Sequence, residues 1–205
     1  MTRQVGILVY DDVEVLDFAG PFEVFSTASR VAARLAPPGS AAAPFTVVLL
    51  AETAAPIRAR AGLLVQPHHA LAEHPPLDVL VVPGGVHEPV MERPAVIAWL
   101  QRQLATTPLV ASVCTGAFLL ARAGLPDGTE VTTHWEDVAN LRRAFPALRV
   151  REDVRWVEHP RLAFSAGISA GLDLSLRLVA RLEGQALAER AARQMDYAWE
   201  QRAPA

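Results

Sequence analysis

Short apolar runs rich in β-branched residues alternate along the chain with longer segments of helical period. Each run predicts a buried strand, because a strand inside a parallel sheet is covered on both faces and its residues are apolar almost without a break. We expect five such strands, which read VGILVY from Val5, FTVVLLA from Phe45, DVLVVP from Asp78, LVASVC from Leu109 and EVTTH from Glu130. Their order predicts an α/β fold with a mostly parallel sheet and helices on both faces.

The segments between the strands predict the helices and the domain organisation. Helices are expected to start near Pro21, Glu92, Thr115 and Glu136, with two more after Ile168 and Gln185. Residues 148–166 contain shorter extended pieces, which predict an edge hairpin and a last inner strand. The run APPGSAAAP at residues 36–44 predicts a surface loop. Since a single core serves a chain of 205 residues, we expect one domain spanning residues 1–205.

Composition and charge indicate which partners and which cellular location to expect. The formal net charge is −3, lysine is absent, and the arginines lie among carboxylates without forming a stripe. This pattern disfavours binding to nucleic acid. The first residues reach Asp11 and Asp12 after only a short apolar run, which is too short for a signal peptide or a membrane span. We therefore expect a cytoplasmic protein that does not associate with membranes.

The single cysteine stands in the most informative segment, LVASVCTGAFLLA at residues 109–121. A buried strand ends at Cys114 and a helix starts within one or two residues, a strand-turn-helix elbow that projects the side chain out of the sheet. Gly116 allows close approach of backbone or substrate. The helix start favours thiolate, but lowers a cysteine pKa by less than about one unit, so strong activation needs another partner. The alternative is an inert core cysteine.

Asp17 is a candidate partner, because it follows the first strand at the same carboxyl edge of the sheet. The strand before it and the Cys114 strand are expected to be neighbours. A carboxylate beside a thiolate raises the proton affinity of both, so the useful arrangement shares one proton between them. Asp17 would then serve as proton donor. The alternative is an N-cap for the helix that contains Gly20 and Pro21 early in its course.

Pro83-Gly84-Gly85 ends another buried strand at this edge, and its backbone N–H groups are oxyanion-hole candidates. The N–H of Thr115 is expected to supply a further donor, as the residue after the nucleophile does in hydrolase elbows. These assignments depend on the shared sheet edge, because tight turns use proline and glycine everywhere.

The histidines give a weaker signal. His134 follows the EVTT run and invites a Cys–His interpretation, yet Thr133 and Glu136 have capping-box spacing, which favours a structural or supporting role for His134. His68, His69, His74 and His87 lack zinc-site spacing, so no metal is expected. We expect no organic cofactor either. Ser165, Gly167, Ser169 and Gly171 are mostly explained by helix capping and packing. Trp135 and Ile168 are candidates for the apolar wall of a pocket.

Taken together, the segments LDFAGPFEVF, VVPGG, VCTGAFLLA, TTHW and SAGISAGLDL resemble the ThiJ/PfpI superfamily, which is related in fold to class I glutamine amidotransferases. The resemblance spans nearly the whole chain. It implies a flavodoxin-like three-layer sandwich, usually a homodimer, with Cys114 at the elbow. LDFAGP and CTGAF resemble isonitrile hydratases and the sensor halves of AraC-type regulators, which places Asp17 at the hydratase carboxylate and Thr115 at its catalytic threonine.

Two departures from the wider superfamily refine the expected chemistry. Many branches carry glutamate in the first-strand region where this chain has Asp17, and proteolytic relatives carry histidine directly after the cysteine where it has Thr115. The resemblance therefore favours hydration of an isonitrile to an N-substituted formamide over proteolysis. A redox or small-ligand sensor is the alternative, and a glyoxalase or deglycase activity on reactive carbonyls is a second. A complete transcription factor is not expected, because too few residues follow the last apolar helix.

Overall fold

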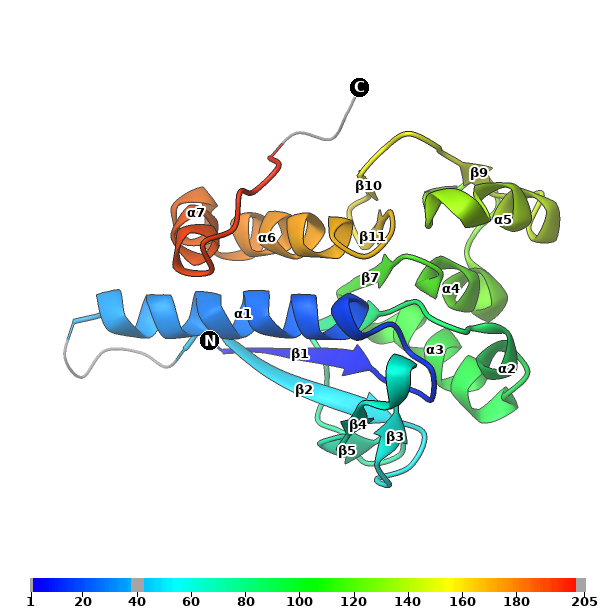
Figure 1. Cartoon of the computed structure of the whole chain (residues 1–205), viewed down its shortest axis with the longest axis horizontal. Coiled ribbons are helices and arrows are strands. Elements are labelled where there is room, and N and C mark those ends of the chain that lie inside the picture. Colours follow the sequence, from blue (N-terminus) through cyan, green and yellow to red (C-terminus); the bar gives the residue numbers. More distant parts are fainter. Residues whose placement is uncertain (1, 38–42, 202–205) are drawn as a thin grey trace.

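The computed structural model describes residues 2–37 and 43–201. A seven-stranded sheet runs through its centre in the order β10-β11-β7-β6-β1-β2-β5 (Figure 1). The strands are β1 (Arg3–Leu8), β2 (Phe45–Ala51), β5 (His69–Ala70), β6 (Val79–Val82), β7 (Leu109–Val113), β10 (Trp156–Glu158) and β11 (Leu162–Ser165). Every pairing is parallel except that of β10 with β11. The expected α/β class with a mostly parallel sheet is confirmed.

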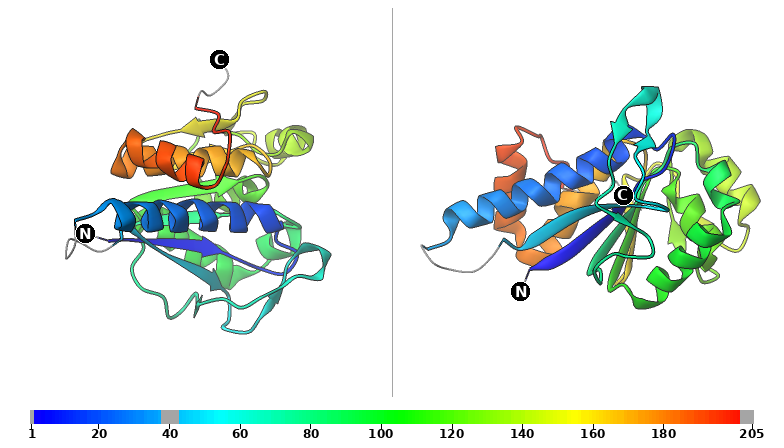
Figure 2. Two further views of the ribbon diagram at one scale, coloured as in Figure 1. Left: turned by 60° about the vertical axis from the view of Figure 1, so that its left-hand side comes forward. Right: turned by 90° about the horizontal axis from the view of Figure 1, so that it is seen from below.

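Helices cover both faces of the sheet and complete the three-layer sandwich (Figure 2). One face carries α1 (Val15–Leu35), α6 (Ala170–Glu183) and α7 (Gln185–Gln194). The opposite face carries α2 (Glu88–Met91), α3 (Pro94–Thr106) and α4 (Gly116–Gly124). In the described part of the chain, none of the helices combines the length and the apolar character that crossing a bilayer requires.

The core lies on both faces of the central strands. All four residues of β6 and all five of β7 are buried, as are the last four of β1. Double-sided burial explains why these three strands read as unbroken apolar runs, and why they could be recognised from the sequence. Their carboxyl ends carry the residues of the candidate site.

The predicted strand at Glu130 does not join the central sheet. It shrinks to β8 (Glu130–Val131), which pairs with β9 (Arg149–Val150) in a separate two-stranded sheet next to α5 (Val138–Ala144). The two threonines after it explain the error. Thr132 Oγ1 donates to the Arg151 carbonyl and Thr133 Oγ1 to the Cys114 carbonyl, so polar side chains fix this segment beside the sheet. The later extended pieces do form the expected hairpin, β10 and β11.

Helix α1 begins six residues before its predicted start. Proline is common in the first turn of a helix, which is why Pro21 suggested a start nearby. Here it lies inside α1, where its missing N–H leaves the Asp17 carbonyl without the usual helical bond. The earlier start places Asp17 in the first turn, directly above the sheet edge.

Strands β1 and β7 are not neighbours, contrary to expectation, because β6 lies between them. From β1 the chain builds outward through β2 to β5, then returns to β6 on the other side of β1 and continues to β7 and β11. The direction of growth therefore reverses between β1 and β6, and such a reversal is where open α/β sheets form ligand crevices.

Two further features lie outside the predicted elements. One is the hairpin of β3 (Ile57–Arg58) and β4 (Leu64–Val65), and the other is the short η1 turn (Arg60–Gly62) that it surrounds. The helix predicted near Glu136 begins as a short turn, η2 (Trp135–Asp137), and continues directly into α5. The loop predicted at residues 36–44 is only partly tested, because residues 38–42 lie outside the described residues.

Candidate active site

Cys114 occupies a sharp elbow between β7 and α4. Its φ angle is 56°, a left-handed conformation that is rare for a residue with a side chain. The surrounding backbone holds it there: its N–H is shared between the Ser165 and Ala166 carbonyls at 3.2 Å each, and its carbonyl accepts the Thr133 hydroxyl at 2.9 Å. The residue is only 7% exposed. The elbow is formed as the sequence indicates, and its thiol is directed into the protein.

Three groups meet the Cys114 sulfur: the Asp17 carboxyl and the backbone N–H groups of Thr115 and Ile168. Burial and the nearby charge of Asp17 raise the pKa of the thiol from 9.0 to about 12, although the two amides favour the thiolate. The sequence indicated a mild lowering by the helix start. Desolvation is the larger effect, so the isolated thiol stays protonated at neutral pH.

Asp17 is fully buried and incompletely paired. Its Oδ2 accepts the Gly84 N–H at 3.0 Å, whereas its Oδ1 has no hydrogen-bond partner among the described residues. Burial raises the pKa of this carboxyl from 3.8 to about 7, against the opposing effect of the Gly84 N–H. The alternative of an N-cap is wrong, because the N-cap of α1 is Glu14 and Asp17 lies within the helix.

The two side chains form one titrating unit. Each changes the pKa of the other, and a carboxyl near 7 beside a thiol near 12 retains one proton between these two values. A proton leaving the sulfur can therefore pass to the carboxylate next to it without entering bulk water. This is the shared-proton arrangement that the sequence suggested, reached across the intervening strand β6.

The Gly84–Gly85 turn follows β6 and holds the pair in place. Its N–H groups are not open to a reactant, so the turn does not form an oxyanion hole. The Gly84 N–H is taken by Asp17, and the Gly85 N–H donates to Thr115 Oγ1 at 3.0 Å. Thr115 Oγ1 in turn donates to the Gly85 carbonyl at 3.0 Å. Both glycine amides are thus occupied by side chains. The free donors near the sulfur are instead the amides of Thr115 and Ile168, and the predicted role of Gly84 and Gly85 is corrected.

Glycine is required at two positions because the backbone is so close. A Cβ on Gly84 would lie 2.6 Å from both the N and the Oγ1 of Thr115 and 2.9 Å from Asp17 Oδ2. A Cβ on Gly116 would collide with the carbonyl of Val82. Gly116 therefore permits the close approach of backbone that the sequence suggested, between α4 and the end of β6, and it does not line the groove described next.

An open groove of about 650 Å³ lies beside the elbow. His134, Trp135 and Ile168 line it, as the sequence suggested for the last two. Trp135 is 75% exposed, and Ile168, which also directs its N–H at the sulfur, is 38% exposed. The groove is completed by Thr132, Thr133, Val138, Glu152, Asp153, Val154, Arg155, Ala166, Gly167 and Ala170.

His134 belongs to the groove and not to the reacting pair. Its ring packs on Gly167, and its Nδ1 lies 3.6 Å from Glu136 Oε2, while no described interaction joins it to the Cys114 sulfur. The capping box proposed for this segment is wrong, because Thr133 Oγ1 binds the Cys114 carbonyl and η2 has no side-chain cap. A supporting role for His134 agrees with this placement.

Tyr10 is a residue that the sequence reasoning missed. It is buried, its hydroxyl donates to the Pro83 carbonyl at 2.9 Å, and burial together with the charges of Asp17 and Cys114 raises its pKa well above 10. The signal was present, since Tyr10 closes the first apolar run at the same sheet edge. Among the described residues, no three His, Cys, Asp or Glu side chains gather in a way that could hold a metal ion.

Comparison with known proteins finds relatives of similar sequence. The chain is 32% identical over 199 residues to an isonitrile hydratase from Pseudomonas putida, covering 97% of this chain and 80% of the relative. It is 29% identical over 188 residues to the HTH-type transcriptional regulator CdhR from Pseudomonas aeruginosa, covering 92% of this chain and 53% of the regulator.

The fold has a similar solved counterpart. A crystal structure of a ThiJ/PfpI family protein from Pseudomonas syringae superposes with a TM-score of 0.82 at 28% identity, covering 98% of this chain and 77% of that one. The family description DJ-1/PfpI matches residues 3–181, which include the whole elbow, Asp17 and the groove. The protein described here belongs to the DJ-1/PfpI family.

Proposed function

We propose that this protein hydrates an isonitrile to an N-substituted formamide, with Cys114 as nucleophile and Asp17 as proton donor and base. The observation that carries the proposal is the buried Asp17–Cys114 pair, in which Asp17 Oδ1 accepts no hydrogen bond from any other described residue. Such an atom is free to exchange a proton with a small reactant. The 32% identity to an isonitrile hydratase supports the same chemistry.

The reaction adds one water to R–N≡C in two stages. As the Cys114 thiol attacks the terminal carbon, its proton passes to Asp17, and the Asp17 carboxyl delivers a proton to that carbon, giving the thioimidate R–N=CH–S–Cys114. The Asp17 carboxylate then takes a proton from the attacking water. That proton passes to the imine nitrogen and gives R–NH–CH(OH)–S–Cys114. Collapse of this adduct moves the hydroxyl proton through Asp17 to the departing sulfur and releases R–NH–CHO, so the enzyme ends as it began.

The remaining groups position the pair. The Thr115 and Ile168 amides stabilise negative charge on sulfur both as it attacks and as it leaves. The Thr115 hydroxyl donates one hydrogen bond to Gly85 and accepts another from it, and we assign it the role of fixing the turn that holds Asp17. The nearby groove, with its apolar Trp135 and Ile168, suits the N-substituent of the substrate.

The test is formamide formation from an alkyl isocyanide. Cys114→Ala should abolish turnover, and the isosteric Asp17→Asn should reduce it by about a thousandfold, because general acid–base catalysis is typically worth 10²–10⁴. Asp127→Asn, which removes one exposed carboxylate in the loop before β8, is the matched control and should keep full activity. Undiminished turnover in Cys114→Ala would exclude this mechanism.

A ligand-sensing role is the second candidate, and the likeness to a transcriptional regulator over 92% of this chain favours it. Sensing would use the same groove without turnover. Peroxide sensing and glyoxalase or deglycase chemistry are the remaining candidates, and both would also use the Cys114 sulfur as the reacting atom. Intact mass after mild peroxide, and an assay with methylglyoxal, test these two directly.

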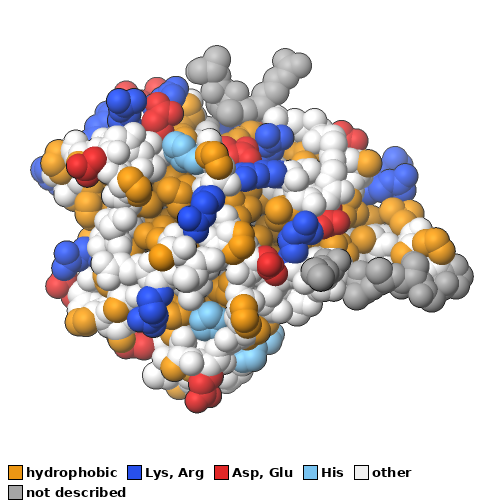
Figure 3. Space-filling model, turned by 180° about the vertical axis from the view of Figure 1, so that it is seen from behind, with side chains coloured by type: hydrophobic (Ala, Val, Ile, Leu, Met, Phe, Trp, Pro, Cys, Tyr) orange, Lys and Arg blue, Asp and Glu red, His pale blue; other side chains and the backbone are white. Residues whose placement is uncertain are grey.

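Three further expectations accompany the proposal: a homodimer, a cytoplasmic location and no binding to nucleic acid. Exposed Leu16, Leu63 and Leu64 offer apolar area for a second copy. On the face in Figure 3, basic and acidic side chains are interspersed and no basic stripe forms, in keeping with the net charge of −3. Light scattering on the purified protein checks the dimer, and a salt-dependent DNA titration checks the last expectation.

A further inference from the structure

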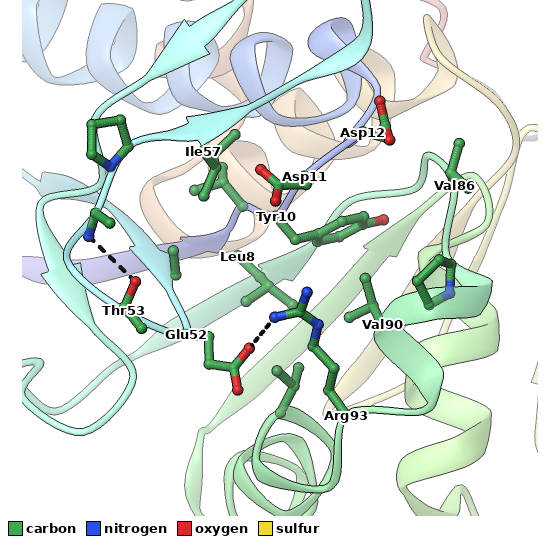
Figure 4. Close-up of a pocket in the computed structure, with 16 residues that line it drawn as sticks. Leu8, Tyr10, Asp11, Asp12, Glu52, Thr53, Ile57, Val86, Val90 and Arg93 are labelled. Carbon is green, nitrogen blue, oxygen red and sulfur yellow. Dashed lines mark hydrogen bonds and ion pairs between the residues drawn. The ribbon is translucent and has the colours of Figure 1, made fainter.

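A second cavity of about 280 Å³ opens at the carboxyl ends of β1 and β2, near the point where the strand order reverses. Neither Asp17 nor Cys114 lines it. Its volume equals that of on the order of nine liquid water molecules, enough for a small organic ligand. Figure 4 shows its lining, which consists of Leu8, Val9, Tyr10, Asp11, Asp12, Ala51, Glu52, Thr53, Ala55, Pro56, Ile57, Val86, Pro89, Val90, Arg93 and Val96.

The cavity has an apolar interior with an aromatic wall. Leu8, Ile57 and Val90 converge on it from three different segments, and the ring of Tyr10 lies among them (Figure 4). A mostly apolar lining with a few fixed polar groups is the usual character of a small-molecule site. The ring face of a tyrosine also attracts a cation placed over it.

The charged residues at the rim of the cavity determine whether a cationic or an anionic ligand is favoured. Arg93 is already neutralised by Glu52, with Nη1 and Oε2 2.6 Å apart. Asp11 and Asp12 take part in no ion pair within the described part of the chain. Asp11 is held in place because its Oδ1 accepts the Arg58 N–H at 2.8 Å. The cavity therefore has an uncompensated carboxylate, that of Asp11, at its exposed rim next to apolar walls.

A continuous set of bonds connects this cavity with the candidate active site. Tyr10 lines the cavity with its ring, while its hydroxyl donates to the Pro83 carbonyl at 2.9 Å. The next residue, Gly84, donates its N–H to Asp17 at 3.0 Å. A ligand that shifts the Tyr10 ring thus acts on the turn that holds Asp17 beside Cys114.

We propose that this cavity is a second ligand site, that it binds a small primary amine as its ammonium ion, and that occupancy is transmitted through Tyr10 to Cys114. The apolar body of the amine fills the space between Leu8 and Val90, and its ammonium group pairs with Asp11. This site is separate from the groove beside the elbow.

Calorimetric titration with n-pentylamine tests the binding step, with 1-pentanol and pentanoate as probes of equal size. Saturable binding of the amine is expected with a dissociation constant of about 1 mM or lower, within the range open to so small a ligand. Asp11→Asn keeps the acceptor for the Arg58 N–H but loses the charge, and should weaken amine binding about tenfold. Asp127→Asn, the matched control, should leave it unchanged.

The coupling step is read from the rate at which iodoacetamide alkylates Cys114, with and without saturating n-pentylamine. The amine should change this rate at least about twofold in the native protein and leave it unchanged in Tyr10→Phe, which keeps the ring but lacks the hydroxyl. Equal binding of pentanol, absence of amine binding, or closure of the cavity by a second copy would overturn the site. An unchanged alkylation rate would overturn the coupling. None of these readouts depends on isonitrile turnover, so the proposed function stands or falls separately.

Discussion

Two aspartates of this protein share position and burial but not surroundings. Asp17 and Asp173 each lie in the first turn of a helix, α1 and α6, and these helices pack against each other on one face of the sheet. Both are 0% exposed. Asp173 is fully paired: Arg155 binds its Oδ2 through Nε and Nη2, and its Oδ1 accepts Tyr197 OH and the Glu200 N–H at 3.1 Å each.

Asp17, by contrast, receives a single backbone N–H and faces a thiol in place of a cation. Burial alone therefore does not define what a carboxylate does. Where an arginine and two further donors meet it, the buried charge is compensated and the residue ties α6 to the C-terminal segment. Where these partners are missing, the same residue type holds its proton near neutral pH and becomes available for chemistry.

The largest stability effect is expected from removing the charge of the paired aspartate. Asp173→Asn leaves the guanidinium of Arg155 facing an amide, and should lower the free energy of unfolding by about 3 kcal/mol, since breaking a buried ion pair from one side is strongly destabilising. Asp17→Asn at pH 8 should not destabilise the fold, because an amide oxygen still accepts the Gly84 N–H. Urea unfolding of both variants measures the difference. Equal losses in the free energy of unfolding would show that the two buried aspartates are stabilised alike.

The next effect is the pH dependence of stability. The folded pKa of Asp17, about 7, is raised above its ordinary value of 3.8, so the folded state holds the proton more tightly than the unfolded chain does. This contribution is fully present below the unfolded value and is lost as pH rises through 7. Between pH 5 and pH 8 the free energy of unfolding should fall by about 2–3 kcal/mol.

In Asp17→Asn this particular loss should disappear. Asp78→Asn is the matched control, because Asp78 also accepts a backbone N–H, from Gln4, but is not fully buried. Its unfolding curve should keep the native pH dependence. A wild-type protein that is as stable at pH 8 as at pH 5 would contradict the assignment of a protonated Asp17.

The smallest effect concerns Gly84, whose N–H donates to Asp17. In Gly84→Ala the new methyl meets Thr115 and Asp17, which should cost about 1–3 kcal/mol of stability as for other overpacked sites, and should displace the carboxyl from the sulfur. Gly20→Ala, where the methyl meets only the flexible side chains of Leu172 and Leu16 among the described residues, should change stability by less than about 1 kcal/mol. Thermal unfolding and the alkylation rate of Cys114 together separate displacement of Asp17 from general unfolding.

The parts of this structure that could be predicted are those encoded locally. The runs of β1, β6 and β7 are buried on both sides, so their composition alone indicates strands, and the abrupt change from LVASVC to TGAF indicates the elbow. Asp17 could be associated with Cys114 because both follow strands at one edge. The strand between them could not be foreseen, since strand order depends on contacts between segments far apart in the sequence.

The errors arise where a local signal competes with a distant contact. Thr133 has the spacing of a helix cap, yet its hydroxyl binds the Cys114 carbonyl. Gly84 and Gly85 look like free donors, yet tertiary packing brings Asp17 and Thr115 onto their amides. The sulfur-facing amide of Ile168 depends on a left-handed backbone, with φ at 47°, at a residue type that gives no sign of it.

The position of β6 between β1 and β7 has a consequence for how the pair can be altered. Neighbouring strands are about 4.8 Å apart, so β1, which leads towards the helix that carries Asp17, and β7, which ends next to Cys114, lie about two such spacings from each other. Strand β6 contributes no reacting side chain, yet it works as a spacer of fixed width whose glycine-rich end fills the gap. The width is set by main-chain hydrogen bonds and is insensitive to most substitutions. To alter this chemistry by redesign, one would therefore change the turn after β6 and keep the two reacting residues, Asp17 and Cys114.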